Sequence, residues 1–230
     1  MKDTYHTISA PAEGEFRDRG SKFIAYAFPV GSQEEWQTRL EEVRKAHPKA
    51  RHHCFAFRIG TDGANYRAND DGEPSGTAGR PILGQIDSFG LTNVFVVVVR
   101  YFGGTLLGAS GLIQAYKNST ADALQKAAIV EKIVMDRFRL SFEYQWLSPV
   151  MNAVKKLELQ IDHQQFEDSA FIDISIRKSD TEAKMLQLKS LVAGVHLEEA
   201  PTLGEIPGFD ILTLPLSPPP IPGENAAKTE

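Results

Sequence analysis

Short runs of alternating hydrophobic and polar residues mark the first half of the chain. They cover residues 5–8, 22–28, 51–59 and 64–68. A period of two places successive side chains on opposite faces of an extended backbone, so these runs predict four strands, each with one buried face. The glycines within residues 60–63 predict a turn between the last two strands.

A helix is predicted between the second and third of these strands. Ser32 and Glu35 have the spacing of a capping box, which satisfies free amides at a helix start. Pro48 disfavours helical geometry in the residue before it, so we expect the helix to stop near His47. Helical spacing predicts that its buried stripe consists of Trp36, Leu40 and Val43.

The longest uninterrupted apolar run of the chain extends from Val94 to Val99. A strand that is apolar at every position is typical of one buried on both faces, so residues 92–99 are predicted to form the centre of a sheet. The run is far shorter than the roughly 20 apolar residues that span a bilayer. We therefore expect neither a membrane helix nor a membrane partner.

Two glycine-rich segments flank this predicted strand. The first, residues 70–79, leads into a helix with Pro81 near its first position and Gly90 at its end. The second, residues 103–111, leads into a long helix over residues 110–128. The buried stripe of that long helix is predicted to be Leu112, Ile113, Tyr116, Thr120 and Leu124.

The second half of the chain predicts the order strand, helix, strand, strand, helix, strand. One helix is expected to begin at Ser148 and Pro149, and the other to open with a capping box of Ser179 and Glu182 and to end at Gly194. This order is that of the split βαβ, ferredoxin-like arrangement. The strands are predicted from the alternation of Phe138, Leu140, Phe142 and Tyr144, over residues 159–166 and 171–176, and within residues 195–214.

The change of pattern divides the chain of 230 residues into two α+β domains, residues 1–136 and 137–215. Residues 215–230 carry five prolines and almost no core-forming residues, so we expect residues 216–230 to form a disordered tail.

The net charge of -5 comes from the second half of the chain, residues 137–230. Residues 1–136 carry 16 basic and 16 acidic residues, whereas residues 137–230 carry 9 and 14. Since binding to a polyanion requires Lys and Arg to replace counterions, any nucleic-acid surface is expected before residue 137. Cys54 is the only cysteine, and the start of the chain lacks the apolar segment of a secretory signal. Both features favour a reducing, cytoplasmic location.

The first glycine-rich segment and the residue after it supply several candidate binding residues: Asp70, Asp71, Glu73, Ser75, Thr77 and Arg80. Glycines followed by a helix start can form a nest of amides that binds an anion. The alternative is a tight connection in which Asp71 and Ser75 only satisfy nearby amides. The three carboxylates could also hold a hard cation such as magnesium, but solvated carboxylates are the favoured interpretation.

The second glycine-rich segment follows Arg100 and Tyr101 and contains Gly103, Gly104 and Thr105. A strand that leads through glycines into a helix is the setting of phosphate-binding loops. The segment lacks the Gly-Lys-Ser/Thr ending of a P-loop and does not fit the dinucleotide fingerprint, so nucleotide hydrolysis is poorly supported. The alternative is that the glycines serve close packing.

His52, His53 and Cys54 are adjacent, which raises the hypothesis of a metal site or a nucleophile pair. Neighbours on a strand point to opposite faces, so all three cannot converge on one zinc ion. No catalytic residue, metal ligand or cofactor is predicted. Two basic groups could form a modest phosphate-contacting surface or simply a solvated face. They comprise Arg17, Arg19 and Lys22, and Lys45, Lys49, Arg51 and Arg58.

Four blocks of this sequence resemble the signature blocks of the IMPACT/YigZ family, in its bacterial form. They are residues 19–25 (RGSKFIA), residues 50–54 (ARHHC), residues 70–83, and residues 98–108 (VVRYFGGTLLG), the last followed by Gly111-Leu112 and Ala115-Tyr116. Residues 109–111 depart from the resemblance, because a richer glycine run is expected there. The second half is similar to the family's smaller C-terminal domain in pattern and position.

The resemblance implies a fold and a setting in translation. The first domain would share the fold of domain two of a small-subunit ribosomal protein, of elongation factor G domain four and of kinases of the galactokinase type. The second domain would resemble the last domains of elongation factor G. Eukaryotic members control translation initiation by competing with an activator of a protein kinase. The sequence shows no counterpart of their extra N-terminal partner-binding domain, so that role is not expected to transfer.

Together these features predict a noncatalytic protein that contacts RNA, the ribosome or a translation factor, without DNA specificity. The predicted contact residues are the candidates named above in the two glycine-rich segments, with the flanking Arg80, Arg100 and Tyr101, and with Arg51 and His53. One alternative is a nucleotide- or phosphate-binding enzyme with a kinase-like first domain. Another is an interaction module whose acidic second half recruits a basic partner.

Overall fold

The computed structural model describes residues 3–61, 64–167 and 170–215, and these form two compact α+β units. The first unit comprises residues 5–132, and the second comprises residues 3–4 together with residues 133–215. The boundary expected at residue 136 falls inside a strand of the second unit, β8 (Met135–Phe142). The tail expected over residues 216–230 lies outside the described residues.

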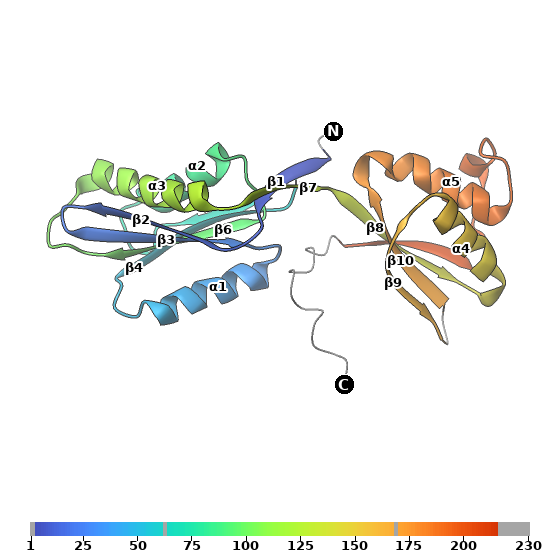
Figure 1. The fold of residues 1–230 in the computed structure, drawn as a ribbon, viewed down its shortest axis with the longest axis horizontal. Coiled ribbons are helices and arrows are strands. Elements are labelled where there is room, and N and C mark those ends of the chain that lie inside the picture. The colour runs from blue at the N-terminus through green and yellow to red at the C-terminus, as the bar shows by residue number, and fades with distance from the viewer. Residues whose placement is uncertain (1–2, 62–63, 168–169, 216–230) are drawn as a thin grey trace. The chain divides into compact units, whose positions relative to one another are not determined.

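The first unit contains a five-stranded antiparallel sheet with helices on both faces (Figure 1). Helix α1 (Gln33–Ala46) lies on one face, and α2 (Gly79–Ser88) and α3 (Gly108–Lys126) lie on the other. A separate two-stranded sheet pairs β1 (Thr4–Ile8) with β7 (Ile129–Ile133). In spatial order, the five strands are β2 (Ala12–Asp18), β3 (Ser21–Pro29), β6 (Val94–Tyr101), β4 (His52–Ile59) and β5 (Asn65–Asn69).

Strand β6 is the centre of this sheet, as its apolar sequence predicts. It pairs with β3 on one side and β4 on the other, and it is buried from Val94 to Arg100. Its even-numbered valines pack into the core beneath α2 and α3, while Phe95, Val97 and Val99 pack into the core beneath α1. Alternate residues of one strand therefore serve two separate hydrophobic cores.

The predicted bounds of α1 are confirmed. Ser32 is the N-cap, and its hydroxyl oxygen accepts a hydrogen bond from the Glu35 amide at 3.3 Å. The Glu35 carboxylate accepts from the Gly31 amide at 2.8 Å, one residue before the cap. His47 is the C-cap, and Trp36, Leu40 and Val43 are the buried residues of the helix.

The predicted stripe of α3 is wrong at one position. Leu112, Tyr116, Thr120 and Leu124 are buried, but Ile113 is 41% exposed. Further along, α3 approaches β2 closely. A Cβ atom on Gly14 would lie 2.2 Å from the Ala123 amide nitrogen and 2.7 Å from the Ser119 carbonyl oxygen. Small residues of α3 therefore face β2 at this point.

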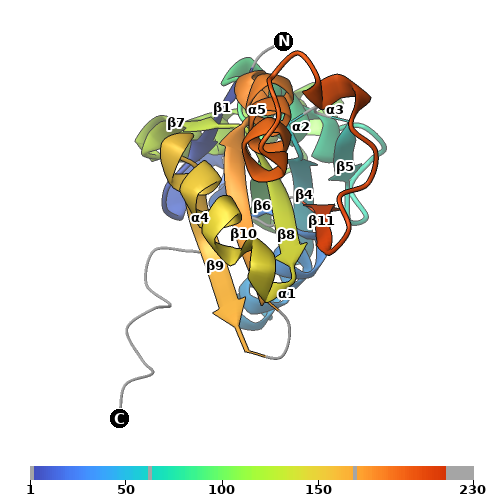
Figure 2. The ribbon, with the colours of Figure 1, turned by 90° about the vertical axis from the view of Figure 1, so that its right-hand side faces the viewer.

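The second unit is a four-stranded antiparallel sheet whose helices α4 (Leu147–Lys156) and α5 (Thr181–Ala193) pack into one core with it (Figure 2). The predicted order of strands and helices is confirmed, with short 3₁₀ turns at Tyr144–Trp146, Lys178–Asp180 and Ala200–Thr202. In spatial order, the strands are β11 (Phe209–Leu214), β8, β10 (Ala170–Arg177) and β9 (Gln160–Phe166).

Three local predictions in this unit are wrong. Strand β8 ends at Phe142, so Tyr144 lies in a 3₁₀ turn and is 58% exposed. Helix α4 begins at Leu147, one residue before the predicted start. The capping box at Ser179 does not form, because the preceding 3₁₀ turn makes Asp180 the N-cap and the Ser179 hydroxyl donates to the Asp180 carboxylate instead.

Replacing Gly14 by Ala is expected to lower the free energy of unfolding by at least about 2 kcal/mol, because the new methyl group overlaps the backbone of α3. Gly84→Ala is the matched control. Gly84 is an exposed position within α2 with no atom within 4 Å of an added Cβ, so this change is expected to raise stability by about 0.5 to 1 kcal/mol. Urea unfolding of both variants measures the difference, and equal effects would contradict the packing account.

Candidate functional site

The first glycine-rich segment folds around the side chain of Asp70. One carboxylate oxygen accepts a hydrogen bond from the Gly76 amide at 2.8 Å, and the other accepts from Ala78 at 3.0 Å and Gly79 at 2.8 Å. Burial acts to raise the pKa of Asp70, but these three bonds outweigh it and hold the pKa below its ordinary value. The amide nest at the start of α2 is thus filled by the protein's own carboxylate.

Asp71 ties the same segment to β4. Its carboxylate accepts from the His53 amide at 2.7 Å, and its carbonyl oxygen lies 2.8 Å from Nδ1 of His52. Gly79 lies against the neighbouring strand, where an added Cβ would be 2.4 Å from the Asn69 nitrogen. The segment is therefore fixed on two sides, and the residue that satisfies the nest is Asp70 rather than Asp71 or Ser75.

Glu73 anchors the segment to the centre of the sheet. Its Oε1 atom lies 2.6 Å from Nη1 of Arg100 and accepts a second hydrogen bond from the Tyr116 hydroxyl at 2.8 Å. The Arg100 and Glu73 side chains are only 8% and 3% exposed. The guanidinium also lies 5.5 Å from the centre of the Phe23 ring. The loop, the end of β6 and helix α3 thus meet at one buried carboxylate.

Cys54 and Tyr116 lie beside this ion pair. The thiol is 3.0 Å from the carbonyl oxygen of Asp70 and 3.2 Å from the Tyr116 hydroxyl. Burial raises the pKa of the Cys54 thiol. Burial also raises the pKa of the Tyr116 hydroxyl, and the neighbouring Cys54 and Glu73 add to the effect. Both groups are therefore neutral near pH 7, which is the opposite of an activated nucleophile.

His53 and Tyr101 lie on the other face of the sheet, beneath α1. The Tyr101 hydroxyl is 2.8 Å from Nδ1 of His47, and Nε2 of His47 is 2.8 Å from the Tyr26 hydroxyl. Burial lowers the pKa of His53. Because Cys54 packs into the opposite core, the predicted alternation of His53 and Cys54 is confirmed. In the described part of the chain, no three His, Cys, Asp or Glu side chains are grouped to hold a metal ion.

The remaining predicted residues divide into packing and exposed positions. Thr77 is buried, and its hydroxyl donates to the Pro74 carbonyl at 2.6 Å. Gly103 serves close packing, since its added Cβ would lie 1.9 Å from the Gly20 carbonyl carbon. The exposed residues of the predicted set are Arg51, Ser75, Arg80, Gly104 and Thr105.

The sequence did not reveal the polar roles of Tyr116 and His47. Tyr116 was predicted only as a core residue of a helix, and His47 only as a helix end. Tyr116 and Glu73 are 43 residues apart in the chain, so no local spacing points to their contact. Tyr116 does belong to the blocks that resemble the family, and this was the only indication in the sequence that it has a role beyond packing.

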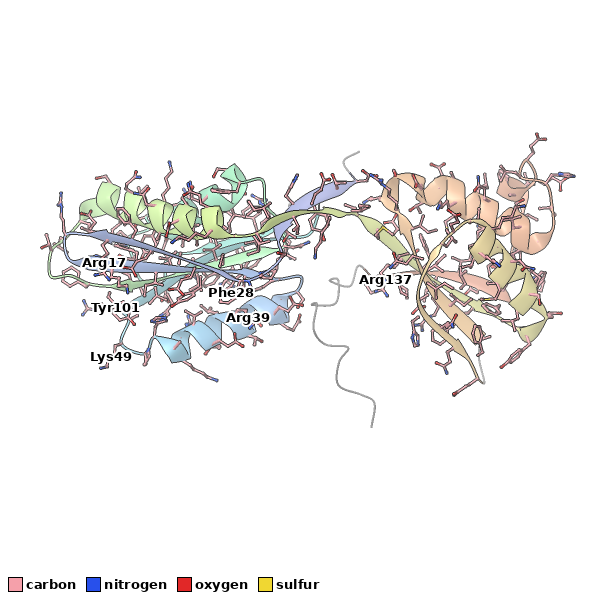
Figure 3. All side chains as sticks on the ribbon, in the orientation of Figure 1. Arg17, Phe28, Arg39, Lys49, Tyr101 and Arg137 are labelled. Carbon is pink, nitrogen blue, oxygen red and sulfur yellow. The ribbon has the colours of Figure 1, made fainter. Side chains whose placement is uncertain are left out.

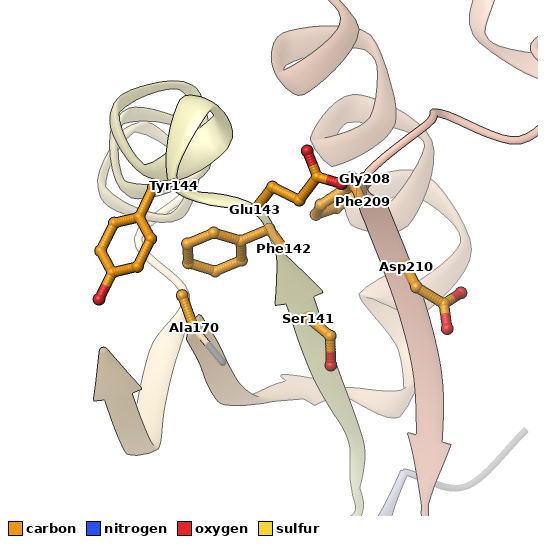
Figure 4. Close-up of a pocket in the computed structure, with 8 residues that line it drawn as sticks. All are labelled: Ser141, Phe142, Glu143, Tyr144, Ala170, Gly208, Phe209 and Asp210. Atoms are coloured by element: carbon orange, nitrogen blue, oxygen red, sulfur yellow. The ribbon is translucent and has the colours of Figure 1, made fainter. Parts of the chain in front are cut away.

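The second unit has a shallow pocket of about 480 Å³, shown in Figure 4. It lies between the end of β8 and the starts of β10 and β11, and its lining includes the aromatic residues Phe142, Tyr144 and Phe209. The backbone around it is joined by a hydrogen bond from the Glu143 amide to the Gly208 carbonyl at 2.8 Å. None of the predicted binding residues lines this pocket.

The fold and the site define a two-unit α+β protein whose first unit carries the anchored first glycine-rich segment. Comparisons with known proteins place a protein of this class in one family. The family model described as the Impact N-terminal domain matches residues 19–124. The IMPACT family member YvyE of Bacillus subtilis is 33% identical over 183 residues, which are 80% of this chain and 84% of that protein. The chain therefore belongs to the IMPACT family, as its resemblance blocks predict.

Two further likenesses extend this result. The Protein IMPACT homolog of Saccharomyces cerevisiae is 38% identical over 115 residues, which are 48% of this chain and 43% of that protein. A solved structure described as that of a hypothetical protein covers 94% of this chain and 100% of its own, with a TM-score of 0.69 and 26% identity. Across the residues that the structure describes, no helix is both long and apolar enough to cross a membrane.

Replacing Asp70 by Asn is expected to lower the free energy of unfolding by about 1 to 2 kcal/mol at pH 7, because the amide nest loses its charged acceptor. The folded protein depresses the pKa of Asp70, so its stabilising effect is present above the ordinary value of about 3.9 and is lost as the pH falls toward the lower folded pKa. Denaturant unfolding from pH 7 to pH 2 measures this difference. A gap between the parent and variant that stays constant with pH would contradict the assignment.

Proposed function

We propose that this IMPACT family member is a noncatalytic binding protein of translation, which contacts the ribosome, RNA or a translation factor through its two glycine-rich segments. The observation that carries this proposal is the anchoring of residues 70–79. Asp70 is hydrogen-bonded to the amides of the segment and Glu73 is buried, while Ser75 and Arg80 are exposed. A loop fixed in this way presents its exposed groups in one conformation, which reduces the entropy lost on binding.

The second segment supports the same proposal. Thr105 is exposed, and Leu106 is 81% exposed. Helix α3 begins just beyond them, at Gly108, and no side chain of the described residues caps it. Free amides at a helix start favour an anionic group such as a phosphate. Arg100 precedes this segment but is buried, so its role in the proposal is to position the first segment rather than to touch the partner.

Family membership supports the setting in translation, since the resemblance implies translational control for eukaryotic members. The yeast relative is matched over less than half of its length, so its own partners are not carried over. The raised pKa values of Cys54 and Tyr116 support a noncatalytic role, because neither group supplies a nucleophile near neutral pH.

Cosedimentation of the full chain with purified ribosomes over a salt series tests the proposal. We expect salt-sensitive association that Arg80→Ala weakens, with a reduction of about 1 in the slope of log affinity against log salt. Lys156→Ala is the control, because it removes an exposed positive charge from α4 in the other unit. Absence of association by the parent protein at every salt concentration would refute the proposal.

A nucleotide arm in the same experiment addresses the enzyme alternative. Adding ATP or GTP is expected to leave ribosome association unchanged and to be followed by no release of phosphate. Turnover of either nucleotide that survives Lys156→Ala and is lost in Arg80→Ala would favour the enzyme instead.

A further inference from the structure

A second surface of the first unit carries side chains that neither glycine-rich segment uses. Arg17, Lys22 and Tyr101 are cross-strand partners on β2, β3 and β6, so they form one row on the α1 side of the sheet. Arg51 adjoins this row, because its amide donates to the Arg100 carbonyl at 3.4 Å. Figure 3 shows Arg17, Tyr101 and Lys49 at the same end of the unit.

Two aromatic rings extend this surface along β3. Tyr26 and Phe28 are two residues apart and share the α1 face, with ring centres 6.4 Å apart and planes inclined by only 19°. Both rings are half-buried. Helix α1 directs Trp36 onto Phe55 and Phe57 of β4, so it covers the middle of the sheet. The Arg39 guanidinium of α1 lies 5.5 Å from the centre of the Phe28 ring, so Tyr26 is the ring of β3 that the helix leaves more open.

His47 fixes two of the rings. It accepts or donates a hydrogen bond at each ring nitrogen, 2.8 Å from the Tyr26 hydroxyl and 2.8 Å from the Tyr101 hydroxyl. Because His47 is also the C-cap of α1, the helix end, β3 and β6 hold both phenol rings in place. Rings that are already fixed lose little conformational freedom when a flat ligand stacks on them.

The charges on this surface are unevenly paired. Arg17 and Lys22 share the carboxylate of Glu15, at 2.5 Å and 2.9 Å, and Glu13 is the cross-strand partner of Tyr26. Lys49 and Arg51 are exposed, and neither forms an ion pair with any residue that the structure describes. These two cations are therefore available to a bound anion.

We infer that this basic aromatic surface, formed by Tyr26, Phe28, Tyr101, Lys49 and Arg51, binds single-stranded RNA. Bases stack on Tyr26 and Tyr101, and the phosphates that link them contact Lys49 and Arg51. Fixed rings beside unpaired cations are the combination with which proteins hold single strands without reading a sequence. A duplex keeps its base faces inside the stack and cannot use the rings. The choice of RNA rests on the proposed role in translation, but the surface is separate from the two glycine-rich segments.

Fluorescence anisotropy with a labelled, unstructured RNA of about 12 nucleotides tests the charge contacts on the full chain. The double variant Lys49→Ala/Arg51→Ala is expected to bind about tenfold more weakly at low salt and to reduce the salt slope by about 1.4, the value for two phosphate contacts to a single strand. The control is Lys155→Ala/Lys156→Ala, which removes two exposed charges from α4 and should stay within about twofold of the parent.

A pair of Tyr26 variants tests the stacking. Tyr26→Leu removes the ring and should weaken binding at least about fivefold, whereas Tyr26→Phe loses the bond to His47 but keeps the ring and should bind like the parent. Circular dichroism and thermal unfolding establish that both variants fold.

Any of four results would overturn this inference. Two concern the parent protein: it does not bind single-stranded RNA at about 50 mM salt, or it binds an RNA duplex equally well. The other two concern the variants: Tyr26→Leu and Tyr26→Phe have equal affinities, or Lys49→Ala/Arg51→Ala and Lys155→Ala/Lys156→Ala lose affinity equally. If the RNA-binding tests fail but ribosome association still depends on Arg80, only the RNA-binding inference is refuted. If RNA binding is found but ribosome association is not, the proposed function of the two glycine-rich segments is refuted and the RNA-binding inference is not.

Discussion

The ion pair between Glu73 and Arg100 is the interaction on which the first unit's candidate site depends. Two charges taken out of water lose several kcal/mol of solvation each, and their attraction repays this only where the geometry is good and further hydrogen bonds are made. The Tyr116 hydroxyl supplies such a bond to the shared carboxylate oxygen. The pair thus joins a loop, a central strand and a helix that are distant in the sequence. Through this pair, the first glycine-rich segment (residues 70–79) is joined to the central strand of the sheet.

The alternation along β6 gives the two faces of the sheet different roles. Arg100 points into the core beneath α2 and α3, where it meets Glu73, while the next residue, Tyr101, points to the α1 side, where it meets His47. A single step along the strand therefore separates a buried anchor from a surface ring. The sequence prediction placed both residues in one contact face, and the pleat of the strand separates them.

The sequence was sufficient wherever one local pattern decides the structure. The capped start of α1, the doubly buried β6 and the strand and helix order of the second unit each follow from residues that are close in the chain. The exposure of Ile113 could not be predicted, because Ile113 has the same helical spacing as the buried Thr120 and Leu124. Likewise, the sequence indicated an anion nest at residues 70–79, but it could not show that Asp70 itself fills the nest. That choice depends on the three-dimensional path of the loop.

The burial of Cys54 has a practical consequence for following the loop in solution. The thiol lies against the carbonyl oxygen of Asp70 and the Tyr116 hydroxyl, and its pKa is raised. Reagents that alkylate cysteine need an accessible thiolate, so they can react only when this part of the fold opens. Since the chain has no other cysteine, the rate at which it is labelled under native conditions reports how often the first glycine-rich segment separates from β4. The native protein thus carries an intrinsic probe of its own local unfolding.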